Sequence, residues 1–399
     1  MIGTKIGNSE ITDDLDNRSG TELTSRFSSL QLTFHHSFRN ILLHVLVFLI
    51  FSPCVNPQQA ELPFEVIPIE EGTPTSIQYI YQDKIGYLWF ATWSGLYKFD
   101  GYNFTSYKND IEDTTSLFDN TLSTIFEDKD GIFWIGSRLG LERFDQKSET
   151  FIHYTPNPVD TGDNESNQIY AICEDTKGEL WVGSGDGLYK FDKITKKFSV
   201  LQSSIDDRES KFHNSIQVIY GDNEGAIWIG GKLGLCKFDS KTDRFESIDG
   251  ITSPKQDINN VDQSNRPKYW NYSVNRFKPV TSGANQRINS IFEDENIILW
   301  LGTEGGLVEF NPKENRYRTY LYNPTARLNI ITSICHDVNS GIVWLATFDG
   351  LYSFDKKTKK FTHYNSDANC VFGERSGTLW IGTKAEIKKL NRTEQFFKK

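Results

Sequence analysis

A tryptophan-centred pattern occurs seven times along this chain, and this repetition constrains the fold more than any other feature. The copies are WFATWSGLYKFD from Trp89, WIGSRLGLERFD from Trp134, WVGSGDGLYKFD from Trp181, WIGGKLGLCKFD from Trp228, WLGTEGGLVEFN from Trp300, WLATFDGLYSFD from Trp344 and WIGTKAEIKKLN from Trp380. Four of the six intervals between these tryptophans are 44 to 47 residues long, and one is 72. Self-similarity at this period indicates a repeat architecture in which each copy is one supersecondary unit.

Each copy contains signals for four short strands. An apolar segment that ends in an acid precedes the tryptophan, as in NTLSTIFED up to Asp128, and a glycine such as Gly131 follows in a tight turn. The tryptophan segment, its Gly-Leu-x-x-Phe-Asp tail and a short run such as FIHY from Phe151 supply the other three strands. These β-branched and aromatic runs between glycines are typical of strands, whereas helices would show apolar spacings of three and four.

Four-stranded units repeated four to eight times are the blades of a β-propeller. We therefore predict an all-β fold, a seven-bladed β-propeller of four-stranded antiparallel blades. The segment LPFEVI from Leu62 has no blade before it, so we expect this N-terminal strand to pair with the last blade and close the ring, in preference to FFKK from Phe396. Such closure removes the open strand edges that invite aggregation.

Three regions are expected along the chain. Residues 1–37 are polar and form a disordered extension, and residues 38–60 contain ILLHVLVFLIF, which is too short to span a bilayer comfortably and suits a signal peptide. A buried core strand is the alternative interpretation of that segment. Residues 61–399 form the propeller, with an insertion at about 250–285 that accounts for the long interval. We expect an exported protein of the periplasm or cell envelope.

Composition and cysteine spacing exclude several functions. The net charge of −10 argues against nucleic acid as a partner, because nucleic-acid-binding proteins present basic surfaces. The four cysteines of the repeats, Cys173, Cys236, Cys335 and Cys370, have no metal-ligand spacing and are interpreted as small buried hydrophobic residues. His153 and His363 lie in fourth strands of different repeats, and no base-plus-nucleophile set assembles. We expect neither a cofactor nor a metal, and no enzymatic activity.

Two rings of side chains are candidates for ligand binding. In a propeller the turns between second and third strands gather at one face, and here they differ from copy to copy: Trp93, Arg138, Asp186, Lys232, Glu304, Phe348 and Lys384. A second ring, five residues before each turn acid, is polar in every copy: Gln78, Ser123, Tyr170, Gln217, Asn289, Thr332 and Asn369. The alternative interpretation of both rings is solvated turn and channel residues.

The residues chosen as binding residues come from these rings and from the insertion. They are Trp93, Arg138, Asp186, Lys232, Glu304, Phe348, Tyr170, Gln217, Asn289 and Trp270. Trp270 lies in the insertion, which is either a lid over the mouth of the channel or a decorative loop. Aromatic faces combined with charged hydrogen-bonding groups suit carbohydrates or acidic sugars.

The repeat resembles a known family. The stretch DKIGYLWFATWSGLYKFDGYNF, which ends at Phe104, together with LPFEVI from Leu62, resembles the two-component regulator propeller repeat, and the likeness extends to about Asn391. This resemblance implies the periplasmic sensor region of a hybrid two-component system, which binds glycan fragments and signals through a membrane helix to a histidine kinase and a DNA-binding regulator. A second propeller or a membrane kinase module is the implied partner.

The chain also departs from the layout that the resemblance implies. Glu386 replaces the glycine of the last copy, and no phosphoacceptor histidine box, ATP site or second membrane segment is present. We therefore expect a sensor fragment or a stand-alone binding module that does not phosphorylate anything itself. The predicted function is a periplasmic ligand-binding sensor propeller for an oligosaccharide or another small ligand. A protein-interaction platform and a propeller lyase or lactonase are the alternatives.

Overall fold

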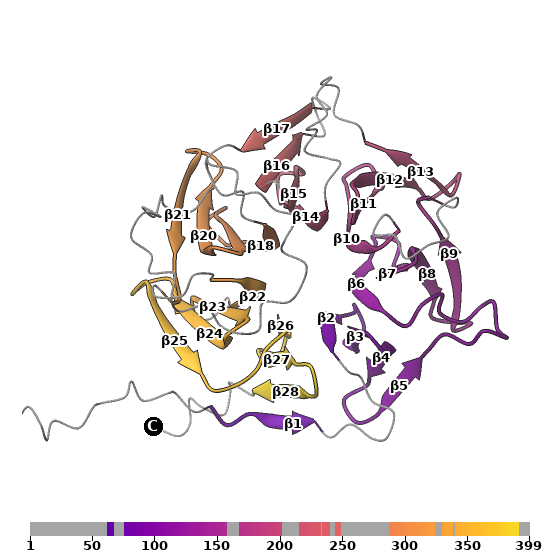
Figure 1. Ribbon diagram of the computed structural model, residues 1–399, viewed down its shortest axis with the longest axis horizontal. Helices are drawn as coiled ribbons and strands as arrows, with labels where there is room; N and C mark the ends of the chain where they lie inside the picture. Colours follow the sequence, from indigo (N-terminus) through magenta and orange to yellow (C-terminus); the bar gives the residue numbers. More distant parts are fainter. Residues whose placement is uncertain are drawn as a thin grey trace, which may run out of the picture. The chain divides into compact units, whose positions relative to one another are not determined.

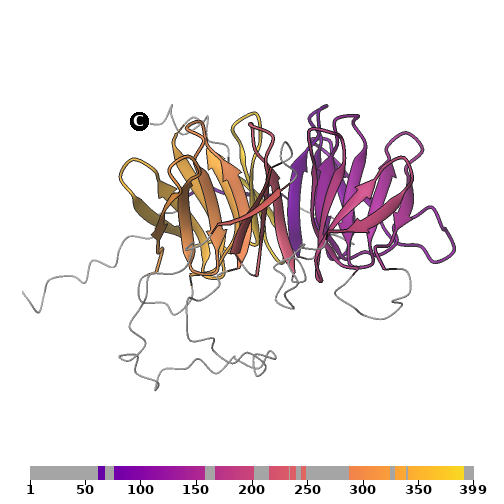
Figure 2. The same ribbon diagram turned by 90° about the horizontal axis from the view of Figure 1, so that it is seen from above.

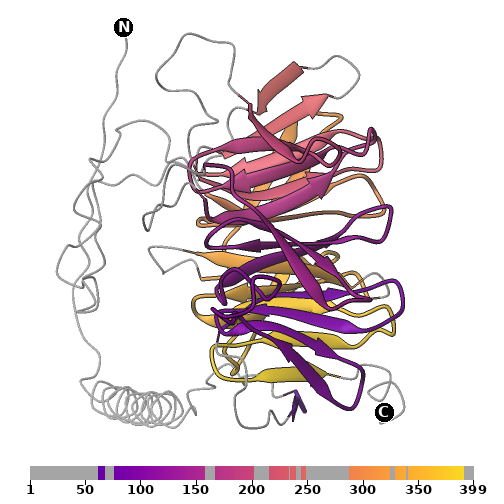
Figure 3. The same cartoon turned by 90° about the vertical axis from the view of Figure 1, so that its right-hand side faces the viewer.

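Seven blades are arranged in a ring about a common axis (Figure 1). The computed structural model describes residues 62–67, 76–157, 167–201, 215–232, 234–239, 244–248, 287–323, 329–337 and 340–390. All of them belong to one unit, Gln59–Lys399. Seen edge-on, the strands run between two opposite faces of the ring (Figure 2 and Figure 3). None of the described residues forms a helix long and apolar enough to cross a membrane.

Every blade is a four-stranded antiparallel sheet. The innermost strands are β2 (Ile77–Gln82), β6 (Leu122–Glu127), β10 (Ile169–Glu174), β14 (Ile216–Gly221), β18 (Ile288–Glu293), β22 (Ile331–Asp337) and β26 (Cys370–Gly373). The second strands are β3 (Leu88–Thr92), β7 (Phe133–Ser137), β11 (Leu180–Ser184), β15 (Ile227–Gly231), β19 (Leu299–Thr303), β23 (Ile342–Thr347) and β27 (Leu379–Gly382).

The third and fourth strands of each blade lie outside the first two. The third strands are β4 (Gly95–Phe99), β8 (Leu141–Asp145), β12 (Leu188–Asp192), β16 (Gly234–Asp239), β20 (Gly306–Asn311), β24 (Gly350–Asp355) and β28 (Ile387–Leu390). The fourth strands are β5 (Phe104–Tyr107), β9 (Thr150–Tyr154), β13 (Lys197–Val200), β17 (Arg244–Ile248), β21 (Arg316–Tyr320), β25 (Lys360–Tyr364) and, in the last blade, β1 (Glu65–Ile67). The predicted all-β, seven-bladed propeller is confirmed.

The last blade combines strands from both ends of the described chain. Its strand order is β1-β28-β27-β26, and β1 pairs antiparallel with β28 so that Glu65 faces Lys389 and Ile67 faces Ile387. The other candidate for this position, FFKK from Phe396, lies outside the described residues. Because the pairing joins a segment that precedes the first blade to the last blade, the seventh sheet reaches four strands like the others.

The repeated acid and the repeated tryptophan bind each other. In six blades the indole Nε1–H donates to a carboxylate oxygen six residues upstream, at 2.8–3.0 Å. In the third blade the other oxygen of Asp175 accepts the backbone N–H groups of Lys177 and Glu179 at 2.9 and 3.0 Å. One buried carboxylate therefore fixes both the turn and the indole. The acids are Asp83, Asp128, Asp175, Asp222, Asp294 and Glu374.

The same tryptophans join each blade to the next. The ring of Trp89 lies 5.7 Å from that of Phe144 in the Gly-Leu-x-x-Phe tail of the following blade, and Trp181 lies 4.5 Å from Phe238. Trp380 of the seventh blade lies 5.8 Å from Phe99 of the first, which continues the contact around the ring. The spacing of these rings is that of favourable aromatic pairs. The repeat motif is thus an inter-blade packing motif as well as a hairpin motif.

Two lysines add ionic contacts between blades at the face that carries the acid turns. Lys193 Nζ of the third blade lies 3.1 Å from Asp128 Oδ2 of the second blade and 2.7 Å from Glu174 Oε1. Lys356 Nζ of the sixth blade lies 3.2 Å from Asp294 Oδ2 of the fifth. Burial by itself would raise the pKa of Asp128 and of Asp294, but hydrogen bonds from the indole, the turn backbone and the lysine outweigh it and lower both pKa values.

Several expectations fall on residues that the structure does not describe. They are the extension 1–37, the hydrophobic segment 38–60 and the insertion at about 250–285 with Trp270. The cysteines of the repeats lie among the described residues: Cys173, Cys236 and Cys370 are buried and Cys335 is half-buried. Burial raises the pKa of the Cys370 thiol to about 12 and that of Cys173 to about 11, so both remain thiols at neutral pH.

The substitution Asp175→Asn tests the acid–tryptophan bond. Asparagine has the same shape but only one acceptor oxygen, so either Trp181 Nε1–H or the two turn N–H groups lose their acceptor. We expect the free energy of unfolding to fall by about 1–3 kcal/mol, the cost of leaving a buried donor unsatisfied. Denaturant titration measures this loss. Asp145→Asn is the matched control: this exposed aspartate accepts two turn N–H groups through one oxygen, and we expect a change within about 0.5 kcal/mol.

Acid stability tests the lysine contacts. The folded pKa values of Asp128 and Asp294 lie below the unfolded value of about 3.9. The stability that they contribute is therefore present above about pH 4 and is lost as the pH falls through the folded pKa values. Removing the lysine in Lys193→Met raises the pKa of Asp128, so the loss should begin at a higher pH than in the wild type. Melting temperatures between pH 3 and pH 7 measure this onset, and an onset equal to that of the exposed control Lys360→Met would contradict the assignment.

Candidate functional site

A β-bulge lies at the start of the inner strand in six blades. In the first blade Ile77 faces Thr92 and Tyr79 faces Ala91, so the residue between them has no partner across the ladder. The same shift occurs in the next five blades. The extra residue is in each case a member of the polar ring expected from the sequence: Gln78, Ser123, Tyr170, Gln217, Asn289 and Thr332. A bulge redirects a side chain out of the regular alternation.

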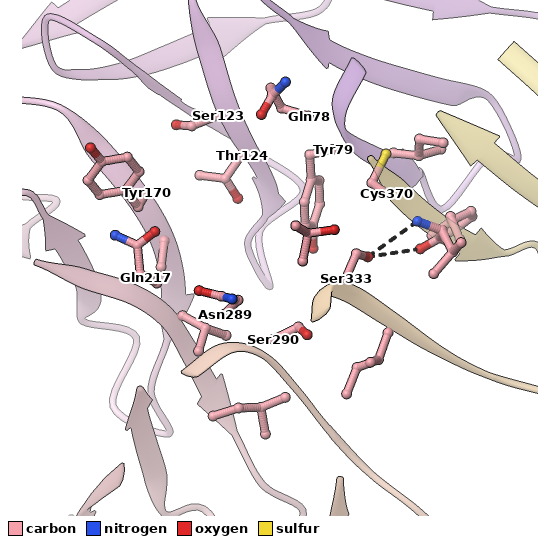
Figure 4. A pocket seen from close by; sticks show the side chains of 18 of the residues that line it. Gln78, Tyr79, Ser123, Thr124, Tyr170, Gln217, Asn289, Ser290, Ser333 and Cys370 are labelled. Carbon is pink, nitrogen blue, oxygen red and sulfur yellow. Dashed lines mark hydrogen bonds between the residues drawn. The ribbon is translucent and has the colours of Figure 1, made fainter. Parts of the chain in front are cut away.

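The bulges allow consecutive residues to line one cavity. Regular strands point successive side chains to opposite faces, yet Asn289 and Ser290 both line a central cavity of about 730 Å³, as do Thr332 and Ser333 (Figure 4). The cavity extends inward as far as the half-buried Cys335. Its volume lies within the range of about 300–1,000 Å³ found for small-molecule sites. The bulges therefore bring polar side chains into the wall around the axis of the ring.

Part of the polar ring has a structural role. Ser123 Oγ, Asn289 Nδ2 and Thr332 Oγ1 each donate to a backbone carbonyl at the start of the next blade's inner strand. The bonds of Asn289 and Thr332 are 2.8 Å long. Gln78 and Gln217 instead bond within their own segments, to Ser76 O at 3.2 Å and to Ser215 Oγ at 2.5 Å. Three members of the ring therefore join blades, which the sequence did not predict.

Two exposed aromatic side chains stand at the mouth of the cavity. Trp93 and Phe348 lie in the second-to-third turns of the first and sixth blades, line the cavity and are 57% and 78% exposed. Glu304 lies in the corresponding turn of the fifth blade, and its Oε1 is 3.7 Å from Nε of Arg287. Trp93, Phe348 and Glu304 were predicted from the sequence, and Arg287 was not. Arg287 directly precedes the inner strand and has no counterpart in the repeat motif.

Three of the expected binding residues do not line the cavity. The guanidinium of Arg138 donates to Asp119 Oδ2 at 2.8 and 3.2 Å. Asp186 Oδ1 accepts from Ser184 Oγ at 2.7 Å and from the Tyr189 hydroxyl at 3.0 Å. Lys232 is also absent from the lining. Of the charged residues expected in this ring, Glu304 is therefore the one that lines the cavity.

The other predicted binding residues either line the cavity or lie outside the described residues. Tyr170, Gln217 and Asn289 line the cavity together with Trp93, Glu304 and Phe348. Trp270 lies outside the described residues. That this group binds a ligand remains a prediction.

The wall of the cavity carries almost no charge. Among the described residues that line it, Arg287 and Glu304 are the only ones of the Asp, Glu, Lys and Arg types. Burial, with the neighbouring charge of Glu293, raises the pKa of Tyr220 to about 12, and burial raises the pKa of Cys370 to the same region. The described residues also contain no group of three or more His, Cys, Asp or Glu side chains that could hold a metal ion. The wall therefore combines neutral hydroxyl and amide groups with apolar side chains.

The inter-blade role of the polar ring is tested by Thr332→Val. Valine keeps the shape but loses the donor to Asn369 O and Ala346 O, so we expect the free energy of unfolding to fall by about 1–2 kcal/mol. Thr121→Val is the matched control, since Thr121 lines the same cavity and bonds through its backbone. A change within about 0.5 kcal/mol is expected there. Equal losses in the two variants, measured by denaturant titration, would refute the assignment.

Comparisons with known proteins agree with this architecture. The family model described as two component regulator propeller matches residues 71–94, 116–138 and 165–186. The curated protein Histidine kinase P4 of Formosa agariphila is 40% identical over 81 residues, which is 20% of this chain and 6% of that protein. The extracellular domain of a putative hybrid two component system from B. thetaiotaomicron superposes with a TM-score of 0.61 and 24% identity, over 83% of this chain and 42% of that one.

A second kind of propeller shares the fold. Virginiamycin B lyase from Staphylococcus aureus superposes with a TM-score of 0.57 and 12% identity, over 82% of this chain and 99% of the lyase. Likeness at this level of identity concerns the fold alone. The chain spans well under half the length of the kinase and of the extracellular domain that it matches. Three of its repeats match the two component regulator propeller model, which confirms the resemblance drawn from their sequence.

Proposed function

We propose that this propeller is the ligand-binding part of a sensor, and that its ligand is a neutral oligosaccharide that enters the central cavity from the face of Trp93 and Phe348. One observation carries the proposal: a cavity of about 730 Å³ is lined by hydroxyl and amide side chains set among apolar residues and has two exposed aromatic side chains at its mouth. Ligand sites of this kind combine apolar surface with a few placed polar groups.

The chemistry of the mouth suits a sugar ring. A sugar presents hydroxyl groups at its edge and C–H groups on its faces, and the negative face of an aromatic ring attracts such polarised C–H groups. The turn that carries Trp93 is held by Thr92, whose Oγ1 donates to Gly95 O at 2.7 Å and accepts Ser94 N–H at 3.0 Å. An aromatic side chain on such a braced turn loses little backbone freedom when it binds.

The distribution of charge favours a neutral sugar over an acidic one. Arg138, which the sequence placed among the binding cations, is held by Asp119 instead and does not line the cavity. Arg287 is the one lining cation among the described residues, and Glu304 neutralises it. A carboxylate or sulfate on the ligand would therefore meet no uncompensated positive charge there.

The sensor role is supported by the proteins that this chain resembles. The matched solved domains are extracellular parts of two component systems, and the matched curated protein is a histidine kinase. By analogy, we place this propeller on the outer side of the cytoplasmic membrane, in the periplasm or cell envelope. Its downstream partner is then a membrane kinase module, reached directly or through a second propeller.

The shape of the face distinguishes this proposal from its alternatives. A protein-interaction platform would present a flat apolar surface, whereas the described face is hollowed by a cavity that polar and apolar side chains line together. A lyase or lactonase would place converging carboxylates or histidines at the mouth. The one carboxylate among the described lining residues is Glu304, which is paired with Arg287.

Thermal-shift and calorimetric titration with neutral oligosaccharides tests the proposal. A ligand that binds the native state raises the melting temperature in a dose-dependent way. We expect such a rise with at least one neutral glycan class. In Trp93→Ala and in Phe348→Ala the Kd should increase at least about fivefold, as for buried aromatic anchors.

Arg138→Gln is the matched control for these variants. Arg138 lies in the same turn of the second blade but points to Asp119, so binding should be unchanged. If no neutral glycan raised the melting temperature, or if Arg138→Gln weakened binding as much as Trp93→Ala, the proposed site would be refuted. A rise with acidic glycans alone would refute the preference for neutral sugars.

A further inference from the structure

One residue breaks the pattern of small side chains in the wall of the cavity. The position directly after the bulge lines the cavity in six blades, and the equivalent residue of the seventh blade, Cys370, lines it as well. In six blades the side chain there is short, and in the first blade it is a tyrosine. The seven residues are Tyr79, Thr124, Ala171, Val218, Ser290, Ser333 and Cys370.

The tyrosine points into the cavity instead of packing between blades. Its neighbours in β2, Ile77 and Ile80, are core residues with 0% and 4% exposure, but Tyr79 is 41% exposed. Figure 4 shows its ring projecting into the space between the labelled residues of the wall. This exposed area on a residue of an innermost strand means that part of the ring faces the open space of the cavity, not a neighbouring blade.

The hydroxyl of this tyrosine lies deep within the ring of blades. Desolvation raises the pKa of Tyr79. Cys370 of the seventh blade, which neighbours the first blade in the ring, lines the same cavity (Figure 4). The structure gives the Tyr79 hydroxyl no hydrogen bond to a described residue, which leaves it available to a ligand.

We propose that Tyr79 is a specificity-determining residue that limits how far a ligand can enter the central cavity and that hydrogen-bonds the inner end of the ligand. This inference rests on the proposed function and adds the selectivity of the site. The short side chains of the other six blades leave the axis open, so one ring from one blade is sufficient to obstruct it. The inner end that Tyr79 meets is a neutral hydroxyl-bearing group, because the charged pair of Arg287 and Glu304 lies at the mouth.

The test begins with two variants and a matched control. Tyr79→Ala removes the obstruction and the hydroxyl, and Tyr79→Phe removes the hydroxyl alone. Tyr102→Ala replaces a tyrosine of the same blade that is 91% exposed and lies between β4 and β5, at the opposite face from the mouth. It is expected to behave as the wild type in every measurement.

The first measurement needs no ligand. Because part of the ring faces the cavity and its hydroxyl has no described partner, Tyr79→Ala should melt within about two degrees of the wild type, as surface substitutions do. Crystal structures should show ordered water interrupted at the Tyr79 ring in the wild type and continuous from the mouth to Cys335 in Tyr79→Ala. A large drop in melting temperature, or continuous water past the ring in the wild type, would overturn the inference.

The second measurement uses neutral linear cello- and xylo-oligosaccharides from disaccharide to hexasaccharide. In the wild type, affinity should stop increasing at the length whose inner end reaches Tyr79, and in Tyr79→Ala the increase should continue by at least one further sugar. Tyr79→Phe should keep the wild-type length limit and bind about two- to tenfold more weakly, as expected for one lost hydrogen bond. A parallel loss at every length in Tyr79→Ala would overturn the inference.

The two measurements separate this inference from the proposed function. If the wild type bound none of these sugars, the proposed function would fail, and the water positions would still decide whether Tyr79 obstructs the cavity. If the sugars bound with the same length profile in the wild type and in Tyr79→Ala, the proposed function would stand and the role of Tyr79 would fail.

Discussion

The bond between the repeat tryptophan and the acid six residues upstream is the interaction on which the rest of the structure depends. A buried carboxylate is costly unless hydrogen bonds satisfy it, and here the indole and the turn backbone do so together, as at Asp175. The bond holds the indole in one orientation, with its ring against the phenylalanine of the next blade. A fully buried tryptophan removes about 150–250 Å² from water, so the orientation of one side chain decides how two sheets pack.

The same packing explains why the bulges are tolerated. Each bulge leaves one residue of the inner strand without a ladder partner, and in three blades its side chain recovers a hydrogen bond from the backbone of the next blade, as Thr332 does with Asn369. The bulged residues therefore contribute to the ring and to the wall of the cavity at once. A site built on innermost strands that are braced on both sides is rigid, which lowers the entropic cost of binding a ligand.

The repeat made the architecture predictable, but the site only in part. Tryptophan spacing, turn acids and glycines specify hairpins locally, and these signals recur in each copy, so strand order and blade number follow. The bulge depends on the register between β2 and β3, which the residues of one strand do not reveal. Regular alternation would point Tyr79 and Gln78 to opposite faces, and Tyr79 was not among the predicted residues. Arg138 was assigned to the mouth from its place in a second-to-third turn, and its partner, Asp119, lies in a connection outside the repeat motif.

In a ring of similar blades, selectivity for a ligand must come from positions at which the repeat motif does not fix the residue. Seven identical blades would give a cavity with seven-fold symmetry, and a sugar does not have this symmetry. The described wall departs from that symmetry on one side, where Trp93, Phe348 and the Arg287–Glu304 pair occupy blades one, six and five. In blades two and three the corresponding charges bond within their own segments, Arg138 with Asp119 and Asp186 with Tyr189. A ligand is therefore held against one sector of the mouth, and Tyr79, from the first blade, belongs to that same sector.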